Sequence, residues 1–390
     1  MNTPMNTAVD TSTDVAGEVK PLVYVMAGGT GGHVIPALAV ARGLAEKGYA
    51  IRWLGTAAGI EARLVPEAGF PIDWLEIGGL RGKNWLTRLL TPWRLMRAVY
   101  VARSYFVRHK PALVLGLGGY ASGPGGLAAR WLGIPLVIHE QNAIAGLTNR
   151  VLARIANQTL AAYLNAFPRA PQAFTVVGNP VRSEIVSMPG VAQRQIGSRG
   201  PVRVLVLGGS LGAKALNDTV PSALSRVSQQ LPISVWHQTG AKNIESAQGN
   251  YKQCKWADGS DYRVVPFIDD MAEAYAWADF VIARAGALTV AEISVAGIGA
   301  LFVPFPHAVD DHQTHNAEPL VQSGAALLMQ QRDMNVERLV DSLIPVLSDP
   351  DRLREMAQAA RERALPKATE TMVRICIETM KKQHKAVSHD

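Results

Sequence analysis

At 390 residues the chain is long for one hydrophobic core, and its length favours two domains. Its 48% hydrophobic and 18% charged residues are typical of a packed globular protein and exclude a disordered chain. The net charge is +7, and the two cysteines, Cys254 and Cys376, lack metal-binding or redox spacing, which favours a reduced, cytosolic compartment.

The beginning of the chain is polar and has no apolar run. Residues 1–20 are therefore predicted to be a disordered leader rather than a secretory signal or a transit peptide. The most apolar stretch, Ala112–Ile138, is interrupted by glycines, Pro124 and Pro135. This pattern predicts strands and a short helix, and no transmembrane helix is expected.

The first expected strand, Leu22–Met26, is followed by the loop Gly28-Gly29-Thr30-Gly31-Gly32-His33, with a helix beginning near Val34. Glycines let the backbone approach a ligand, and a helix start presents N–H groups with partial positive charge, so the loop is predicted to bind an anion. In that first turn the helix dipole would keep His33 neutral, and a neutral imidazole can accept a proton. A tight turn without a ligand is the alternative for the loop taken alone.

The dinucleotide-binding version of this loop is excluded. A G-x-G-x-x-G pattern that starts at Gly29 meets Val34 where the third glycine belongs. The second expected strand, Ile51–Leu54, also ends without an acid that could bind a ribose. The sequence therefore does not predict a nicotinamide-dependent oxidoreductase.

A basic stretch follows, because no Asp or Glu occurs between Glu76 and Glu140. Its first part mixes cations with large apolar side chains and favours docking on an anionic membrane surface over nucleic acid, with a solvated charged turn as the alternative. The residues expected at the membrane or the acceptor are Arg81, Lys83, Trp85, Leu86, Leu89 and Leu90. From Pro92 the spacing predicts an amphipathic helix. Its expected buried residues are Leu95, Met96, Val99, Ala102 and Phe106.

Strand-like runs alternate with helical stretches along the chain, which predicts an α/β fold with parallel, doubly wound sheets. The break at Gly178-Asn179-Pro180 and the linker-like residues 187–201 separate two sets of strands. We expect a Rossmann-like domain at 21–180, joined by the C-terminal helix 368–382, and a second one at 181–367. Ligands are expected in a cleft that the two domains face, at the carboxyl ends of their strands.

The second domain contains its own strand–glycine–helix signals. Val202–Leu207 is followed by the glycine turn 208–212, and the segment Ala283–Glu292 repeats the arrangement. The N–H groups of the latter helix can hold a diphosphate, and Glu292 can accept the hydroxyls of a ribose. An acid that caps the helix start is the alternative for Glu292.

Six motifs in order along the chain resemble the MurG family, the N-acetylglucosaminyltransferases of bacterial cell-wall synthesis. The match extends from about Leu22 to the last helices. The motifs are Gly28–His33, Gly118-Gly119-Tyr120-Ala121-Ser122-Gly123-Pro124, His139-Glu140-Gln141-Asn142, Gly178-Asn179-Pro180-Val181-Arg182, Ala285–Val290, and Asp311-His312-Gln313 with Asn316-Ala317.

This resemblance implies a two-domain GT-B enzyme that moves N-acetylglucosamine from UDP to the C4 hydroxyl of a lipid-linked muramyl-pentapeptide with inversion. Ile268 would hold the uracil, Glu292 the ribose, Ser210 and the helix start at Ala287 the diphosphate, and Gln313 the sugar. The full set implied to contact UDP-N-acetylglucosamine is Thr30, Gly31, Gly32, Asn142, Arg182, Ser210, Ile268, Ala287, Leu288, Thr289, Val290, Ala291, Glu292 and Gln313. Members of the family often have serine where Ala291 stands.

Inversion needs one in-line displacement in which a base removes the proton of the acceptor. His33 is the candidate catalytic base, and Glu140 is a weaker one because an unburied glutamate is too acidic. Helix starts together with Arg182 or Arg284 would neutralise the leaving UDP, so neither a metal nor another cofactor is expected. The Asp-x-Asp triplet, Asp349-Pro350-Asp351, is predicted to be a helix cap instead of a metal site.

Three other functions compete with this hypothesis. A zinc site at His307, His312 and His315 lacks the spacing of helical metal ligands. A UDP-N-acetylglucosamine 2-epimerase of the same fold would not need the basic, Trp-rich stretch 81–93. A nucleotide-sugar-binding or membrane scaffold protein would have no turnover. The preferred interpretation is a peripheral glycosyltransferase on the cytoplasmic face of the bacterial inner membrane.

Overall fold

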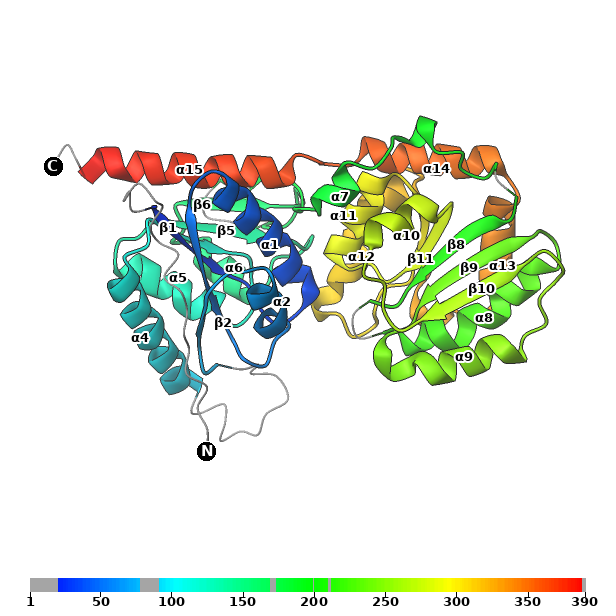
Figure 1. Ribbon diagram of the computed structural model, residues 1–390, viewed down its shortest axis with the longest axis horizontal. Coiled ribbons are helices and arrows are strands. Elements are labelled where there is room, and N and C mark those ends of the chain that lie inside the picture. The colour runs from blue at the N-terminus through cyan, green and yellow to red at the C-terminus, as the bar shows by residue number, and fades with distance from the viewer. Residues whose placement is uncertain (1–19, 78–90, 169–172, 199, 210–211, 388–390) are drawn as a thin grey trace. The chain divides into compact units, whose positions relative to one another are not determined.

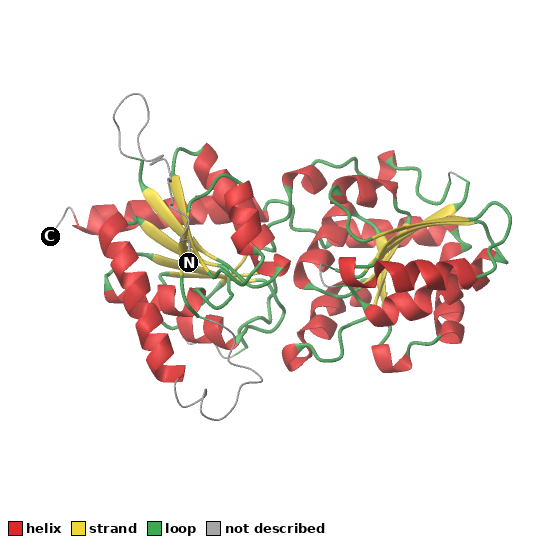
Figure 2. Ribbon diagram, turned by 60° about the horizontal axis from the view of Figure 1, so that its bottom comes forward, coloured by secondary structure: helices red, strands yellow, loops and turns green. Residues whose placement is uncertain are grey.

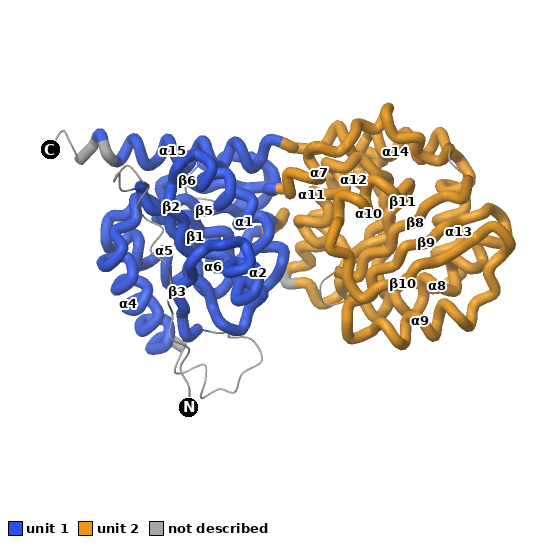
Figure 3. The backbone as a smooth tube through the Cα atoms, in the orientation of Figure 1, with its two compact units in different colours: residues 1–141, 145–180, 367–390 blue, residues 142–144, 181–366 orange. Residues whose placement is uncertain are grey.

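The computed structural model describes residues 20–77, 91–168, 173–198, 200–209 and 212–387 (Figure 1). The predicted leader before Lys20, the membrane residues Arg81, Lys83, Trp85, Leu86, Leu89 and Leu90, and the donor-site residue Ser210 lie outside the described residues. The chain divides into two compact units (Figure 3). Unit 1 comprises residues 1–141, 145–180 and 367–390, and unit 2 comprises residues 142–144 and 181–366.

In the described part of unit 1, seven parallel strands form one sheet in the order β3-β2-β1-β4-β5-β6-β7. The chain enters at β1 in the middle and winds outward in both directions, which is the doubly wound pattern. The strands are β1 Leu22–Met26, β2 Ala50–Gly55, β3 Ile72–Trp74, β4 Leu113–Gly116, β5 Leu136–Glu140, β6 Gln158–Ala161 and β7 Thr175–Val176.

Helices cover both faces of this sheet (Figure 2). Successive side chains of a strand point to opposite faces, so Val23 and Val25 belong to the core formed with α1 and α15. Tyr24 and Met26 belong to the core formed with α4 and α5. The helices of unit 1 are α1 Gly31–Glu46, α2 Glu61–Glu67, α4 Thr91–His109, α5 Ser122–Trp131, α6 Leu147–Leu152 and α15 Ala368–Val387.

Unit 2 repeats the architecture with a parallel sheet of six strands among its described residues, in the order β10-β9-β8-β11-β12-β13. The strands are β8 Val202–Leu207, β9 Ile233–Gln238, β10 Asp261–Val265, β11 Phe280–Ala283, β12 Gly299–Phe302 and β13 Ala326–Leu328. The predicted class, two Rossmann-like parallel-sheet domains, is confirmed.

The faces of the second sheet are also distinguished by alternation along one strand. Leu205 and Leu207 of β8 belong to the core formed with α10 and α11, and Val204 and Val206 to the core formed with α8 and α13. The helices of unit 2 are α7 Ser183–Val186, α8 Lys214–Ser228, α9 Ile244–Gln253, α10 Met271–Trp277, α11 Ala287–Ala296, α12 His312–Gln322, α13 Val336–Leu347 and α14 Pro350–Glu362.

Some predicted boundaries are wrong by a few residues. α1 begins at Gly31 instead of near Val34, because glycines are tolerated in a first turn where few side chains contribute. This start places His33 in the first turn, as the dipole argument requires, and Pro36 in the second turn. Asp349 is a helix cap as predicted, since its side chain accepts hydrogen bonds from the N–H groups of Asp351 and Arg352.

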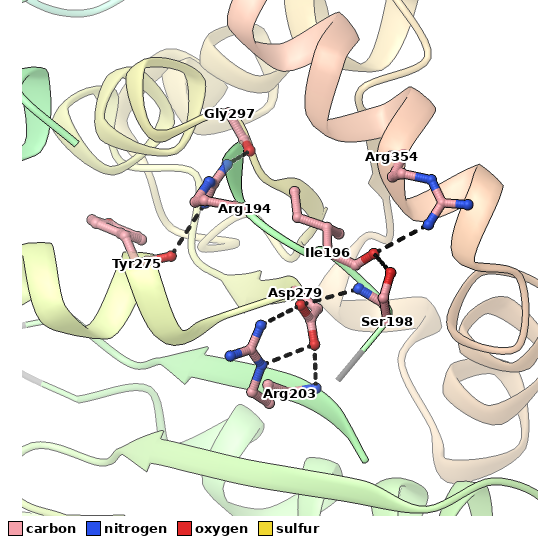
Figure 4. A network of polar contacts seen from close by, with 9 residues as sticks. Arg194, Ile196, Ser198, Arg203, Tyr275, Asp279, Gly297 and Arg354 are labelled. Atoms are coloured by element: carbon pink, nitrogen blue, oxygen red, sulfur yellow. Dashed lines mark hydrogen bonds and ion pairs between the residues drawn. The ribbon is translucent and has the colours of Figure 1, made fainter. Parts of the chain in front are cut away.

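Part of the expected linker 187–201 is fixed to unit 2 by a buried polar network (Figure 4). Arg194 donates hydrogen bonds to the carbonyls of Ala296 and Gly297, at the end of α11, and to that of Tyr275. Burial, and next the nearby Arg361, lower the pKa of Arg194 to about 10. The glycine and polar residues of 187–201 are typical of a linker, but hydrogen bonds to the rest of unit 2 fix part of this segment.

Asp279 joins the same network to β8. Its buried carboxylate accepts hydrogen bonds from the Arg203 backbone N–H at 3.0 Å, from the Arg203 guanidinium at 2.7 and 3.1 Å, and from Gly197 N at 3.3 Å. The Asp279 side chain is 2% exposed and the Arg203 side chain 17%, so the buried carboxylate depends on the guanidinium for its counter-charge.

Replacing Asp279 with alanine is expected to lower the free energy of unfolding of unit 2 by about 3–5 kcal/mol, because the largely buried Arg203 guanidinium and the N–H groups of Arg203 and Gly197 would lose their acceptor. Urea unfolding followed by circular dichroism measures the change. The matched control is Asp218→Ala, which removes an exposed pair with Lys214 and should cost about 0.5 kcal/mol or less. Similar losses in the two variants would contradict the assignment.

Candidate functional site

In unit 1 the glycine loops gather at the carboxyl ends of the central strands. The loop 27–30 follows β1, the loop 117–121 follows β4, and Gln141 follows β5. β1 pairs with β4, and β4 with β5, so these three strand ends are neighbours in the sheet. The parallel arrangement therefore brings residues from three separate sequence motifs to one edge.

His33 lies against the second of these loops. Its Nδ1 is 3.1 Å from Gln141 Oε1, and a Cβ on Gly118 would lie 2.8 Å from the same Nδ1. Gly119 approaches the first loop even more closely, since a Cβ there would lie 2.5 Å from Gly28 O. Both glycines have positive φ, 100° and 85°, which favours glycine for a second reason. The two loops can pack only because these positions lack side chains.

The carboxylate of Glu61 binds the backbone of the first loop, 27–30. It is fully buried and accepts hydrogen bonds from Gly29 N at 2.8 Å, Thr56 N at 3.1 Å and Thr56 Oγ1 at 2.7 Å. The N–H of Gly29 is thus bonded to a protein carboxylate. Glu61 lies six residues after the end of β2 at Gly55, and the sequence carries no periodic signal that marks it as the partner of Gly29.

Glu140 is buried, unlike the unburied carboxylate assumed from the sequence. Its Oε2 accepts hydrogen bonds from Gly146 N at 3.1 Å and from Asn149 Nδ2 at 2.8 Å. The neighbouring His139 is also buried, its Nε2 lies 2.9 Å from Gly178 O, and burial lowers its pKa to about 4. The Glu140 carboxylate is therefore engaged in fixing the loop after β5. This engagement, and not the acidity of an unburied glutamate, favours His33 over Glu140 as the base.

In unit 2, α11 begins directly after Gly286, at the carboxyl end of β11. A glycine before the helix offers no side-chain oxygen to the first N–H groups, so a ligand anion would meet the positive end of the helix dipole. Ala287, Leu288 and Val290 are buried, and Thr289 and Ala291 are partly buried. The diphosphate role of this helix start remains a prediction.

Glu292 lies in the second turn of α11 and is almost completely buried. Its Oε2 accepts a hydrogen bond from Tyr275 Oη at 3.2 Å, and its Oε1 lies 3.8 Å from Arg182 Nε. Within the described residues Oε1 has no hydrogen-bond donor. Burial raises the pKa of Glu292, against the opposing effects of Arg182 and Tyr275. A capping residue would accept hydrogen bonds from the N–H groups at the helix start. Glu292 instead accepts one from the Tyr275 hydroxyl, so it is not a helix cap.

The other expected donor-site residues of unit 2 lie in four separate segments of the chain. Arg182 precedes α7, and Ile268 is buried in the loop after β10. Gln313 lies in the first turn of α12, where its Oε1 accepts a hydrogen bond from Phe305 N at 2.8 Å. Asn142 Oδ1 accepts a hydrogen bond from Asn316 Nδ2 at 3.3 Å.

The Arg284 guanidinium donates to the carbonyls of Val303 and Pro304 and to Gln331 Oε1, so the loops around β12 take three of its five N–H donors. Gln238, which the sequence did not indicate, fixes the glycine turn after β8. Its Oε1 accepts from Gly209 N at 3.1 Å, and its Nε2 donates to Gly209 O at 3.0 Å.

Thr30, Gly31 and Gly32 complete the expected set from unit 1. Thr30 is the exposed N-cap of α1, and the two glycines form the start of its first turn. The described residues contain no group of three His, Cys, Asp or Glu side chains that could hold a metal ion, and none of their helices is long and apolar enough to span a membrane. His315 of the zinc hypothesis has an ion-pair partner in Glu318 at 3.1 Å.

Large apolar side chains are exposed on α4 and α5. We call Trp93, Met96, Tyr100, Leu127 and Trp131 the α4–α5 surface; Trp93 is 73% exposed and Trp131 52%. Tyr100 packs edge-on against Trp131 at 5.4 Å, and Arg103 lies 5.0 Å above the same indole ring. Of the residues expected to be buried in α4, Val99, Ala102 and Phe106 are, whereas Met96 is exposed.

Two family models together cover most of the chain. Residues 23–161 match the glycosyltransferase family 28 N-terminal domain, and residues 203–372 match the glycosyltransferase family 28 C-terminal domain. A curated relative from Shewanella denitrificans is 49% identical over 364 residues, which are 93% of this chain and 98% of the relative. It is named UDP-N-acetylglucosamine–N-acetylmuramyl-(pentapeptide) pyrophosphoryl-undecaprenol N-acetylglucosamine transferase.

Solved structures agree with these matches. The crystal structure of Acinetobacter baumannii MurG superimposes with a TM-score of 0.79 at 42% identity, covering 92% of this chain and 99% of that chain. The structure of UDP-GlcNAc 2-epimerase from Neisseria meningitidis superimposes with a TM-score of 0.63 at 13% identity, covering 93% and 100%. At that identity the second likeness shows a shared fold alone.

The raised pKa of Glu292 makes a prediction about stability. A carboxyl group that holds its proton longer in the folded state than in the unfolded one lowers the free energy of unfolding as the pH rises from its ordinary value of 4.5 through its folded value. Glu292→Gln cannot titrate, so the wild type should lose stability relative to this variant across that window. Urea unfolding at a series of pH values measures it. A pH-independent difference between the wild type and Glu292→Gln would refute the prediction.

Proposed function

The chain belongs to glycosyltransferase family 28, and we propose that unit 2 binds the nucleotide sugar while unit 1 supplies the base and engages the acceptor. The enzyme transfers N-acetylglucosamine from UDP-N-acetylglucosamine to N-acetylmuramyl-(pentapeptide) pyrophosphoryl-undecaprenol, the lipid I to lipid II step of peptidoglycan synthesis. The observation that carries this conclusion is 49% identity to a transferase of that name over 93% of the chain.

The proposed donor site is centred on α11. Glu292 would accept the ribose hydroxyls through Oε1, the buried oxygen that the described residues leave without a donor. The start of α11 and Arg182 would bind the diphosphate, and Ile268 the uracil. Gln313 would bind the sugar through its amide NH₂, because its Oε1 is engaged by Phe305 N. Asn142, Ser210 and Thr30–Gly32 complete the proposed contacts.

The chemistry that these groups support is one in-line displacement. His33 accepts the proton of the acceptor's C4 hydroxyl while the oxygen forms a bond to C1 of the donor sugar. The bond between C1 and the diphosphate oxygen breaks, and UDP leaves with the electron pair. The positive end of α11 and Arg182 stabilise the negative charge that develops on the leaving group. The configuration at C1 inverts because the attack comes from the face opposite UDP.

An anionic membrane surface is the proposed second contact of unit 1. The α4–α5 surface supports it, because exposed Trp and Tyr side chains beside arginines are the combination that inserts into and binds a charged lipid interface. Helix α4 directly follows the expected docking residues 81–90 in the chain. We therefore infer a peripheral enzyme that binds the membrane in which its lipid-linked acceptor lies.

The activity is tested by UDP release from UDP-N-acetylglucosamine in EDTA, with and without a lipid-linked muramyl-pentapeptide acceptor. Release should require the acceptor and persist in the chelator. His33→Ala should lower kcat by about 100-fold or more, the usual contribution of a general base, with UDP binding unchanged. Acceptor-independent release would indicate an epimerase or hydrolase, and release abolished by EDTA would indicate a metal. Full activity of His33→Ala would refute His33 as the base.

Membrane binding is tested by sedimentation with phosphatidylglycerol and phosphatidylcholine vesicles. Binding should favour the anionic vesicles and weaken with salt. Replacing Trp131 with serine should weaken it by about tenfold, the equivalent of about 1.5 kcal/mol of lost apolar burial. Leu365→Ser, an exposed apolar residue of unit 2, is the control and should change nothing. Equal binding to neutral vesicles at high salt would contradict the electrostatic part.

A further inference from the structure

Gln141 is a buried amide whose orientation is determined by its partners. Its side chain is only 1% exposed, and its Nε2 donates a hydrogen bond of 2.8 Å to Leu117 O. A backbone carbonyl oxygen can only accept, so the amide nitrogen must face Leu117. The opposite orientation would place two acceptor oxygens against each other in a buried site, and it is excluded for that reason.

The amide oxygen of Gln141 must then face His33. Gln141 Oε1 lies 3.1 Å from His33 Nδ1, and an amide oxygen also can only accept. The hydrogen bond therefore requires a hydrogen on Nδ1. Because a neutral imidazole carries a single N–H, its lone pair is then on Nε2.

The surroundings hold both residues in this arrangement. Asn179 Nδ2 donates a hydrogen bond of 3.0 Å to the backbone carbonyl of Gln141, which fixes the start of the loop after β5. On the other side, the imidazole ring lies against the backbone of Gly118, where a side chain would collide with it. Neither the amide nor the ring can turn without losing a buried contact.

We propose that Gln141 is a positioning residue that selects the Nδ1–H tautomer of His33 and so makes Nε2 the atom that receives the acceptor's proton. This inference rests on the proposed role of His33 as the base. The hydroxyl proton passes to Nε2 as the oxygen–C1 bond forms, and UDP takes the electron pair of the bond that breaks. The resulting imidazolium keeps its Nδ1–H bond to Gln141.

The tautomer is measured directly on the wild-type enzyme. Two-bond ¹H–¹⁵N correlation spectra of protein labelled at histidine nitrogens distinguish Nδ1–H from Nε2–H, with His33→Ala identifying the His33 signals. We expect Nδ1–H for His33 in the wild type. In Gln141→Met, which keeps the length of the side chain but removes the acceptor, the signals should shift to a mixture or to Nε2–H. A wild-type His33 that carries its hydrogen on Nε2 would overturn the proposal, whatever the kinetics show.

Kinetics separates positioning from a merely structural role. Gln141→Met should lower kcat by about 10- to 100-fold, a substantial part of what a general base contributes, and leave KM for UDP-N-acetylglucosamine within about twofold. In a His33→Ala background the same substitution should have no further effect on kcat. An equal loss in that background would mean that Gln141 acts elsewhere and would overturn the inference.

A structural control uses a buried hydrogen bond of unit 1 outside these loops. Thr379 Oγ1 of α15 donates to Ile375 O at 2.7 Å. Thr379→Val should leave the His33 tautomer and kcat unchanged. If His33→Ala itself retains full activity, the proposed base role fails, while the spectra still decide the tautomer assignment. The two failures are therefore distinguishable.

Discussion

The close approach of two glycine loops determines the arrangement of unit 1. Gly119 lies against the backbone of Gly28, and Gly118 lies against the ring of His33, at distances that no Cβ would permit. This packing brings the first turn of α1 to the loop after β4. His33 and Gln141, 108 residues apart in the sequence, consequently come within hydrogen-bond distance. The chemistry of the site follows from a backbone contact that only glycine allows.

The alternation of apolar runs with glycine turns was sufficient to predict both sheets, because each strand–turn–helix unit is encoded locally. The partners of the polar side chains were not predictable in the same way. Three hydrogen bonds join different elements of the fold: Glu61 with Gly29, Gln238 with Gly209, and Tyr275 with Glu292. The sequence around a polar residue has no periodicity that would indicate its partner. Glu140 illustrates the consequence, since its burial depends on Asn149 and the loop between them.

Helix α4 shows a second limit of sequence reasoning. One stripe, with Val99, Ala102 and Phe106, packs into the core, while another, with Trp93, Met96 and Tyr100, is exposed. Both stripes have helical spacing, so periodicity alone cannot determine which one the protein buries. The buried stripe is the one that packs on the apolar cluster formed by β1 and α5. The exposed stripe is continued on α5 by Trp131, which contacts Tyr100. Exposing apolar side chains to water is unfavourable, and an exposed apolar surface of this kind is typical of an interaction site.

Helix α11 links the stability of unit 2 to its proposed donor site. At its C-terminal end, Arg194 and Arg361 donate to the carbonyls of Val295, Ala296 and Gly297, which complements the negative end of the helix dipole. At its start, Gly286 has no side-chain oxygen that could cap the helix, and the positive end of the dipole lies at the proposed diphosphate position. Between them Glu292 keeps one carboxylate oxygen buried without a donor in the described residues. A buried acceptor without a donor is destabilising, and a ribose hydroxyl that donates to Oε1 would offset that cost.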